Sequence, residues 1–296
     1  MNSKTLWQWL AQKTSGVFGV GLVAGLTCSG VAWTGAQLPA RAETASPQAA
    51  PSTPAAVSAP APTEIIDLLK KIDTAASRQD LNATLKFYSP AFTSGDGLDY
   101  KTFGEALKGF WQTTKSLQYQ TQINNWQSQG GDHYLVETTT TVQGTQTAIE
   151  REMQLSATIR SRITITGQQI QTQEILSEQT RLTAGSAPPT ILVNLPEQVN
   201  VGQSFSFDAI VKEPLGDALL LGSALEEPIT PERYLRPSAI ALEPLSAGGV
   251  FKVGQAPQQP SRHWISAILV KDNGITIVSQ RLSVVRPNAS TSATPR

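Results

Sequence analysis

The spacing of apolar residues changes once along this chain, and that change limits the folds it can adopt. Between residues 63 and 115, apolar side chains recur every three or four positions, which is the period of an amphipathic helix. From about 117 to 182 they recur at every second residue, the period of a strand with one buried face. Helices followed by a run of strands predict an α+β layer arrangement for residues 63–183.

The predicted helices begin at residues that can cap them. Thr63 is expected to cap the first helix, Asp80 a short second helix and Asp99 a third. The short second helix is expected to continue to Tyr88 and to end before Pro90. The sequence therefore predicts three helices before the first strand.

Four strands are predicted after the helices. They cover residues 117–127, 133–143, 150–165 and 168–182, and glycines at 130–131, 144 and 167 are expected to separate them. Within the third strand, apolar residues alternate with polar or charged ones, so one face is expected to be buried and the other solvated. The four strands predict an antiparallel, curved sheet against which the helices pack.

The N-terminus has the organisation of a secretory signal peptide. Lys4 and Lys13 precede an apolar run at 16–36, and the pattern Ala-Arg-Ala ends at Ala42, after which cleavage is expected. Two alternatives are an uncleaved membrane anchor and lipoprotein processing at Cys28, although the residues before that cysteine fit a lipobox poorly. Each of these places the protein in the periplasm or another extracytoplasmic compartment.

Charge and cysteine content narrow the partners and the chemistry. The whole chain has 23 basic and 23 acidic residues, but residues 1–42 hold three of the basic ones and none of the acidic ones. The mature chain would therefore have a net charge of −3, which argues against nucleic acid or an anionic membrane surface as its main partner. Cys28 is the single cysteine, so no disulfide is expected. Residues 43–62, rich in Pro and Ala, and the tail 287–296 predict disordered segments.

A second folded domain is predicted after a composition break at 184–189. From residue 190, short alternating runs are separated by turn signals such as Asp-Asn-Gly at 272–274, and one of these runs covers 234–242. The segment 197–205 resembles the opening of bacterial immunoglobulin-like modules. The run of short strands and this resemblance both favour an all-β immunoglobulin-like sandwich over 190–286. His263, next to Trp264 in a predicted strand, is expected to face outward.

The first domain resembles a known superfamily. A helix, a short helix followed by Leu-Lys-Phe-Tyr-Ser-Pro-Ala-Phe at 85–92, a turn, a further helix and a long meander are similar to the nuclear transport factor 2-like cone. Ketosteroid isomerase, scytalone dehydratase and the SnoaL-like polyketide cyclases belong to this superfamily. The resemblance implies a cone with its ligand or substrate in the open end, and a homodimer formed through the outer face of the sheet.

The same resemblance marks Asp96 as a candidate general base. Asp96 lies eight residues after Tyr88, as the proton-transferring aspartate of the isomerase does. The isomerase also needs donors that stabilise an oxyanion, but its helical tyrosine falls at Ile72 and its protonated aspartate within the non-acidic segment 159–161. Asp96 is equally an ordinary turn residue in Ser-Gly-Asp-Gly.

Five residues are candidates for binding a ligand inside the predicted cone, and each has a plainer interpretation. Glu174 lies four residues from Glu178, so the two carboxylates could face a cavity together or simply be solvated. The aromatic candidates could instead be core residues. No group of His, Cys, Asp or Glu has metal-ligand spacing, and no cofactor is expected. The five binding candidates are Tyr88, Phe92, Trp111, Trp126 and Glu174.

Three functions are compatible with these patterns. The first is a non-catalytic, exported bacterial envelope protein that binds a small apolar molecule or an envelope protein through the cone. The second is a SnoaL-like or isomerase-like enzyme that uses Asp96 as general base. The third is a purely structural component of an envelope complex. The shortage of paired acid and base groups favours the first of these.

Overall fold

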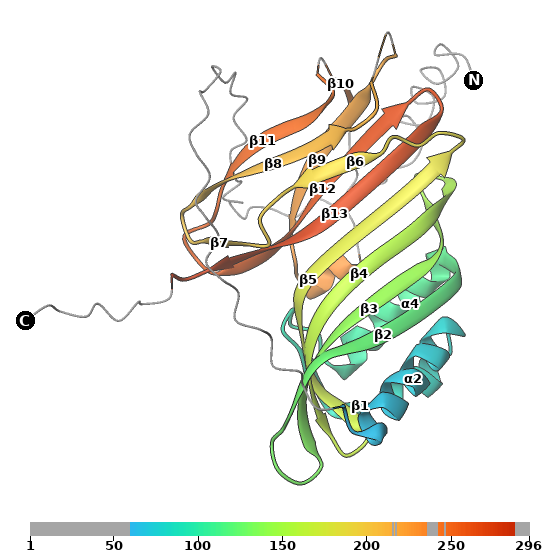
Figure 1. Ribbon diagram of the computed structural model, residues 1–296, viewed down its shortest axis with the longest axis vertical. Coiled ribbons are helices and arrows are strands. Elements are labelled where there is room, and N and C mark those ends of the chain that lie inside the picture. The colour runs from blue at the N-terminus through green and yellow to red at the C-terminus, as the bar shows by residue number, and fades with distance from the viewer. Residues whose placement is uncertain (1–59, 215, 217, 236–241, 246, 288–296) are drawn as a thin grey trace, which may run out of the picture.

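The computed structural model describes residues 60–214, 216, 218–235, 242–245 and 247–287 (Figure 1). The predicted signal peptide, most of the linker at 43–62 and nearly all of the C-terminal tail lie outside these residues. No helix in the described parts of the chain is both long and apolar enough to cross a membrane.

Four described helices and thirteen strands form the fold. The helices are α2 (Thr63–Ser77), α3 (Leu81–Leu85), α4 (Tyr100–Thr113) and α5 (Pro231–Leu235). The strands of the N-terminal half are β1 (Tyr88–Ser94), β2 (Thr114–Ser128), β3 (His133–Ala148), β4 (Arg151–Thr166) and β5 (Gln169–Gly185). Those of the C-terminal half are β6 (Ile191–Asn194), β7 (Gln198–Asn200), β8 (Ser204–Val211), β9 (Leu221–Pro228), β10 (Glu243–Pro244), β11 (Gly249–Gln255), β12 (Ser261–Lys271) and β13 (Gly274–Val285).

Two of the three predicted helix caps are confirmed. The Asp80 side chain accepts a hydrogen bond from the Ala83 amide, and Asp99 forms a reciprocal capping box with Thr102. The prediction for Thr63 is wrong, because Pro62 occupies the N-cap position and no side chain caps α2.

Tyr88 and Gly144 belong to strands, contrary to the sequence prediction. The short helix ends at Leu85, and Tyr88 begins β1, which pairs in parallel with β5. Gly144 does not separate two strands. It lies within β3, where a β-carbon would approach the Lys115 carbonyl oxygen to 2.9 Å, so that its small size allows the neighbouring strand to pack closely. The turn falls instead at residues 149–150, both of which have positive φ.

One large sheet runs through both halves of the chain, and this overturns the predicted fold class. Its strand order is β10-β9-β12-β13-β5-β4-β3-β2, with β1 and β7 attached at its sides. Residues 274–280 of β13 pair with 179–185 of β5, so the ladder crosses from one half to the other without a break. An α+β cone beside a separate immunoglobulin-like sandwich is therefore a wrong description. Residues 184 and 185, assigned to a linker from composition, belong to β5.

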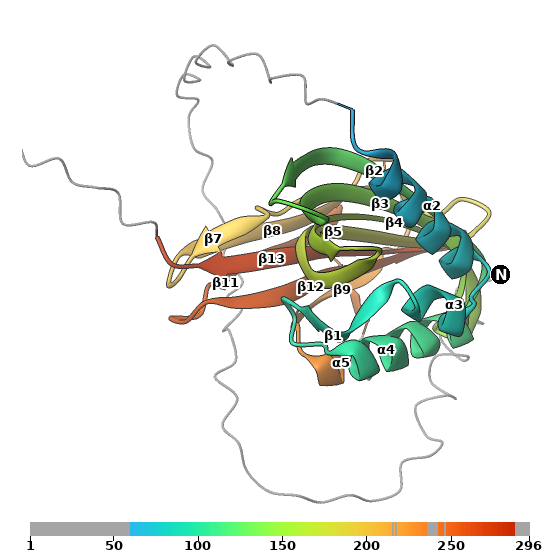
Figure 2. The same cartoon turned by 90° about the horizontal axis from the view of Figure 1, so that it is seen from below.

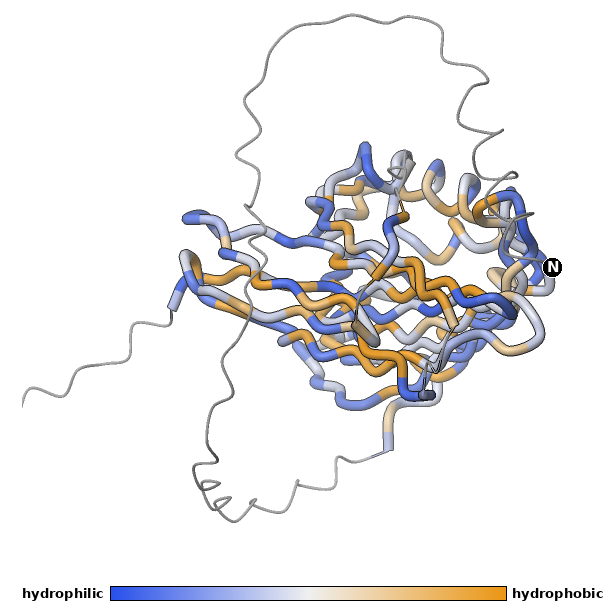
Figure 3. The backbone as a smooth tube through the Cα atoms, turned by 90° about the horizontal axis from the view of Figure 1, so that it is seen from above, coloured by the Kyte–Doolittle hydropathy of each residue, from blue (hydrophilic) through white to orange (hydrophobic). Residues whose placement is uncertain are grey.

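Helices and a small second sheet cover opposite faces of the large sheet. Helices α2, α3 and α4 lie against β2–β5, and α5 lies beside α4 (Figure 2). The three-stranded sheet β11-β8-β6 packs on the other face, over β9, β12 and β13 (Figure 1). Figure 3 shows apolar segments concentrated where these layers meet. Residues 234 and 235, the start of the strand predicted at 234–242, belong instead to helix α5, and 236–241 lie outside the described residues.

A shared apolar core explains why the two halves join. One cluster combines Trp111 of α4 and Met153 of β4 with Ile268 of β12 and Ile275 of β13. Alternating apolar residues in β5 and β13 mark strands with a buried face, but they do not state which strand lies alongside which. The pairing of these two strands is therefore a tertiary result that the alternation alone could not predict.

We expect the described chain to unfold in one cooperative step, because the ladder and the core both cross from one half to the other. Urea denaturation followed by the fluorescence of Trp111 and of Trp264, each in a variant whose other tryptophans are replaced by Phe, should give coincident transitions. Two separate midpoints would show that the halves are independent.

Candidate functional site

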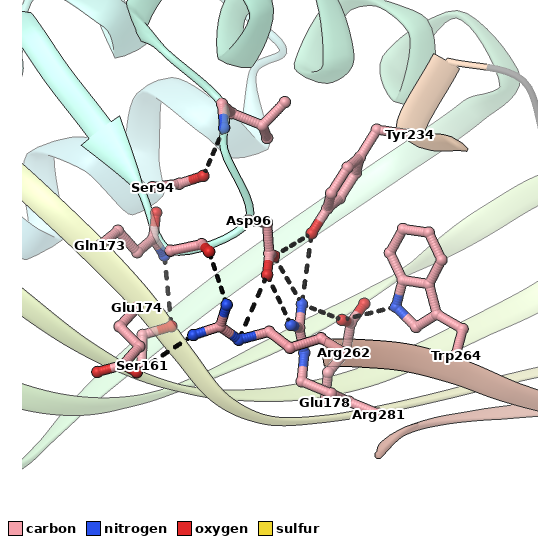
Figure 4. A network of polar contacts seen from close by, with 12 residues as sticks. Ser94, Asp96, Ser161, Gln173, Glu174, Glu178, Tyr234, Arg262, Trp264 and Arg281 are labelled. Carbon is pink, nitrogen blue, oxygen red and sulfur yellow. Dashed lines mark hydrogen bonds and ion pairs between the residues drawn. The ribbon is translucent and has the colours of Figure 1, made fainter. Parts of the chain in front are cut away.

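Asp96 sits in a turn that holds its side chain over the large sheet (Figure 4). The turn follows β1, and the Gly95 amide donates to the Gln173 carbonyl of β5 at 2.8 Å. Gly97 has φ of 85°, a conformation that favours glycine, and so the chain can reverse directly after Asp96. The turn predicted at 94–97 is thus confirmed, and it directs Asp96 inward.

Asp96 forms a buried, two-pronged ion pair with Arg281 of β13. The Nη1 and Nη2 atoms of Arg281 lie 2.8 Å from Oδ1 and Oδ2, respectively. The side chain of Asp96 is 3% exposed and that of Arg281 is 0% exposed. The Tyr234 hydroxyl of α5 donates a third hydrogen bond, 2.6 Å long, to Oδ2. Among the described residues, the side chains that hydrogen-bond the Asp96 carboxylate all come from the C-terminal half.

The charges in this cluster stabilise one another. Burial raises the pKa of Asp96, but the hydrogen bonds and charge of Arg281 outweigh it and hold that pKa below its usual range. Burial and the Asp96 charge raise the pKa of Tyr234 far above its ordinary value, so the phenol keeps its proton and acts as a donor. Burial alone would lower the pKa of Arg281, but Asp96 and Glu178 raise it.

A second ring of polar residues surrounds the ion pair. Glu178 of β5 accepts from Arg281 Nη2 at 3.2 Å and from the Trp264 indole at 3.0 Å. Arg262 of β12 donates to the Gly95 carbonyl at 2.8 Å and lies 3.5 Å from the Glu174 carboxylate. The network therefore ties the turn of the N-terminal half to strands β5, β12 and β13.

This geometry suits a buried ion pair that joins the two halves of the chain better than it suits a proton-transfer site. A general base near neutral pH needs a free lone pair, access to substrate and a pKa close to the operating pH. Both Asp96 oxygens are bonded within the protein, and its carboxylate is weakly basic. The sequence pattern did not single out Arg281 and Tyr234. No local pattern distinguishes a buried arginine in a strand from an exposed one. The burial of Arg281 beside Asp96 follows only from the placement of β13 beside β5.

The predicted aromatic binding residues do not converge on Asp96. Tyr88 and Phe92 are buried and pack with Phe103, with ring centroids 4.7 to 5.1 Å apart. Trp111 is buried in the core shared by the two halves, and its indole donates to the Tyr119 hydroxyl at 3.1 Å. Trp126 packs at the edge of the cluster that contains Tyr88. These rings fill space between the helices and the sheet.

Glu174 joins the polar network from its exposed side. Its carboxylate is 45% exposed and lies 3.5 Å from both Arg162 and Arg262. Glu174 and Glu178 both face the network, but Glu178 belongs to the buried Arg281 cluster and Glu174 to the solvated rim. Between them, the extra residue at 176 forms a bulge against β4, which bends β5 at this point.

His263 is buried, so the prediction of an outward-facing residue is wrong. Its Nε2 lies 2.9 Å from Ser261 Oγ, and its Nδ1 lies 2.9 Å from Glu226 Oε1. The chain of contacts from serine to histidine to carboxylate is that of a hydrolase triad. However, Nδ1 of His263 is not aligned for a hydrogen bond to the Glu226 carboxylate. The aligned bond that orients and stabilises a catalytic imidazole is missing here. The three residues therefore form a buried polar contact between β9 and β12.

An open groove of about 400 Å³ lies on the outer side of α2 and α3. Lys70, Lys71 and Arg78 give it three basic groups, and Asp67 and Asp80 two acidic ones. The groove lies apart from Asp96 and contains none of the predicted binding residues. Within the described residues, no group of three or more His, Cys, Asp or Glu side chains is arranged to hold a metal ion.

A family model described as a domain of unknown function (DUF8623) matches residues 186–285, about a third of the chain. This match does not support the predicted immunoglobulin-like domain. No curated protein matches the chain.

Several solved structures resemble part of the chain. Bd1075 of Bdellovibrio bacteriovorus has 18% identity and a TM-score of 0.28, covering 38% of this chain and 40% of its own. A Catenulispora acidiphila protein described as having a ketosteroid isomerase-like fold, solved with trimethylamine, has 10% identity and a TM-score of 0.28, covering 37% and 83%. A Nostoc punctiforme protein of unknown function with a cystatin-like fold has 16% identity and a TM-score of 0.28, covering 38% and 87%. At these scores the likeness supports no functional conclusion.

Replacing Arg281 by Met should destabilise the protein by about 3–5 kcal/mol, because Asp96 would be left buried and unpaired. Adding Asp96→Asn to Arg281→Met should recover part of that loss. The matched control is Arg262→Met at the 36% exposed rim, which should cost about 1 kcal/mol or less. Urea denaturation measures all three variants, and equal losses for the two single arginine variants would contradict the assignment of Arg281 as the buried partner.

The stability of the protein should fall as the pH drops below about 4. The pKa of Asp96 is lower in the folded than in the unfolded chain, so its contribution is full above the unfolded pKa and is lost as the pH falls toward the folded pKa. The free energy of unfolding of Asp96→Asn, measured with urea from pH 6 to pH 2, should change less steeply over this acid range. Parallel curves for the two proteins would contradict the lowered pKa.

Proposed function

We propose that this protein is a non-catalytic, exported bacterial envelope protein that acts by binding a protein partner. The observation that carries the proposal is the state of Asp96. At the position where the superfamily resemblance expects a proton-transferring carboxylate, Arg281 and Tyr234 occupy both oxygens. The C-terminal half thus covers the site at which a related enzyme would meet its substrate.

The packing around Asp96 favours a protein partner over a small apolar ligand. Tyr88, Phe92 and Phe103 fill the space beneath the helices with mutual ring contacts. Tyr234 packs edge-to-face on Trp264, with ring centroids 4.8 Å apart, above the ion pair. A small molecule entering there would have to displace core side chains and expose a buried charge, which is costly. A protein partner can bind an outer surface without that cost.

The N-terminal sequence and the superfamily resemblance support the rest of this proposal. The basic, apolar and small-residue segments before Glu43 are those of an export signal. The order of α2, α3, α4 and the meander β2–β5 agrees with a nuclear transport factor 2-like origin for the N-terminal half. In this proposal, the C-terminal half was added to the open side of that fold and closed it.

Native mass spectrometry of the protein purified from its own envelope fraction tests the proposal. We expect the mature chain to carry a bound polypeptide, and Asp96→Asn to carry the same one provided that the variant is folded. A stoichiometric adduct of small-molecule mass on the wild-type protein, lost in Asp96→Asn, would contradict both the protein partner and the non-catalytic role of Asp96.

A further inference from the structure

Strand β11 leaves one side of its backbone unpaired. Its residues 249–255 pair with 204–210 of β8 in an unbroken register, and β11 ends the small sheet. The Val211 amide donates to the Gly248 carbonyl at 2.8 Å, which fixes the alternation of hydrogen-bonded pairs along the ladder. The N–H and C=O groups of Phe251 and Val253 therefore point away from β8. No backbone partner for them is found among the described residues.

Three other edges of the described sheets, those of β2, β10 and β6, are protected. On β2, two bulges interrupt the strand, and side chains of α2 accept from its edge amides, Ser77 from Tyr119 and Asp73 from Thr121. Strand β10 has two residues, one of them proline. Strand β6 has four residues, and Arg181 donates to the carbonyl of its first residue. Proteins commonly block exposed edges by such means, because an open edge invites another strand.

Within the described residues, strand β11 has no bulge and no proline, no side chain like those of α2 covers its outer amides, and Lys252 is its one charged residue. It has seven consecutive pairs. Phe251 and Val253, on its outer face, are 50% and 38% exposed, although both are large apolar residues. Lys252 lies on the opposite face and has no ion-pair partner among the described residues. An occupant of this edge would therefore present apolar side chains toward Phe251 and Val253, and an acidic one toward Lys252.

We propose that the edge of β11 binds an extended segment of a partner polypeptide, which adds to the small sheet as a fourth strand. Main-chain hydrogen bonds to Phe251 and Val253 would supply affinity, and the alternation of apolar and acidic side chains would supply selectivity. This inference names the docking surface of the protein-binding function proposed above and rests on it.

A defined peptide tests this surface on the full mature chain. The probe is a fluorescein-labelled peptide of about nine residues in which valine alternates with threonine and a central threonine is replaced by glutamate. Fluorescence anisotropy should show saturable binding. A peptide of the same sequence, N-methylated at alternate residues on the bonding side, should not bind, because it lacks the amide donors. Equal binding of both peptides would contradict strand addition.

Three variants locate the binding edge. Val253→Pro removes an outward-pointing amide that does not hydrogen-bond β8. Phe251→Lys places a charge at the edge. Each variant should weaken peptide binding by at least about tenfold. Leu192→Lys is the matched control, since Leu192 is also 50% exposed but lies on β6 at the opposite edge. It should bind like wild type. If Val253→Pro does not fold, as judged by circular dichroism, Phe251→Lys decides.

Two further outcomes would overturn the inference in different ways. Concentration-dependent dimerisation that Phe251→Lys abolishes, without peptide binding, would assign the edge to a second copy of this chain. A partner that native mass spectrometry finds equally on wild type and on Phe251→Lys, in the absence of peptide binding, would reject the docking edge but leave the proposed protein-binding function standing.

Discussion

The pairing of β13 with β5 is the interaction on which the other features of this structure depend. It extends a four-stranded meander into a ten-stranded sheet and places the C-terminal strands next to the turn that carries Asp96. Without that pairing, Arg281 would be a charged residue with no reason to be buried, and Asp96 would face solvent from an ordinary turn. The shared core and the ion pair are both consequences of the same ladder.

The Asp96–Arg281 pair shows how a buried carboxylate is stabilised between the two halves of the chain. Burying a carboxylate in a low-dielectric interior disfavours its charged form. A nearby cation and further hydrogen-bond donors offset the cost of burying that charge. Arg281, Tyr234 and the surrounding ring of Glu178, Trp264 and Arg262 provide that compensation. The result is a fixed contact between the halves of the chain.

Helix and strand content could largely be predicted from the sequence, because those signals are local. Asp80 and Asp99 cap helices as their side-chain chemistry requires, and strands were predicted within β2, β3, β4 and β5 from their period of two. Two errors in the predicted helix cap and strand boundary have local causes that the spacing of apolar residues does not indicate. Pro62 took the position expected for Thr63, and Gly144 was a site of close backbone approach instead of a turn.

The sequence by itself determined helices α2–α4, strands β2–β5, and that Asp96 lies in a turn. These properties follow from the spacing of side chains and from short-range hydrogen bonding. The tertiary structure decided that β5 and β13 are neighbours, that Asp96 meets Arg281, and that His263 is buried beside Glu226. Strand partners far apart in sequence are chosen by the total burial of the folded chain, which no local pattern records.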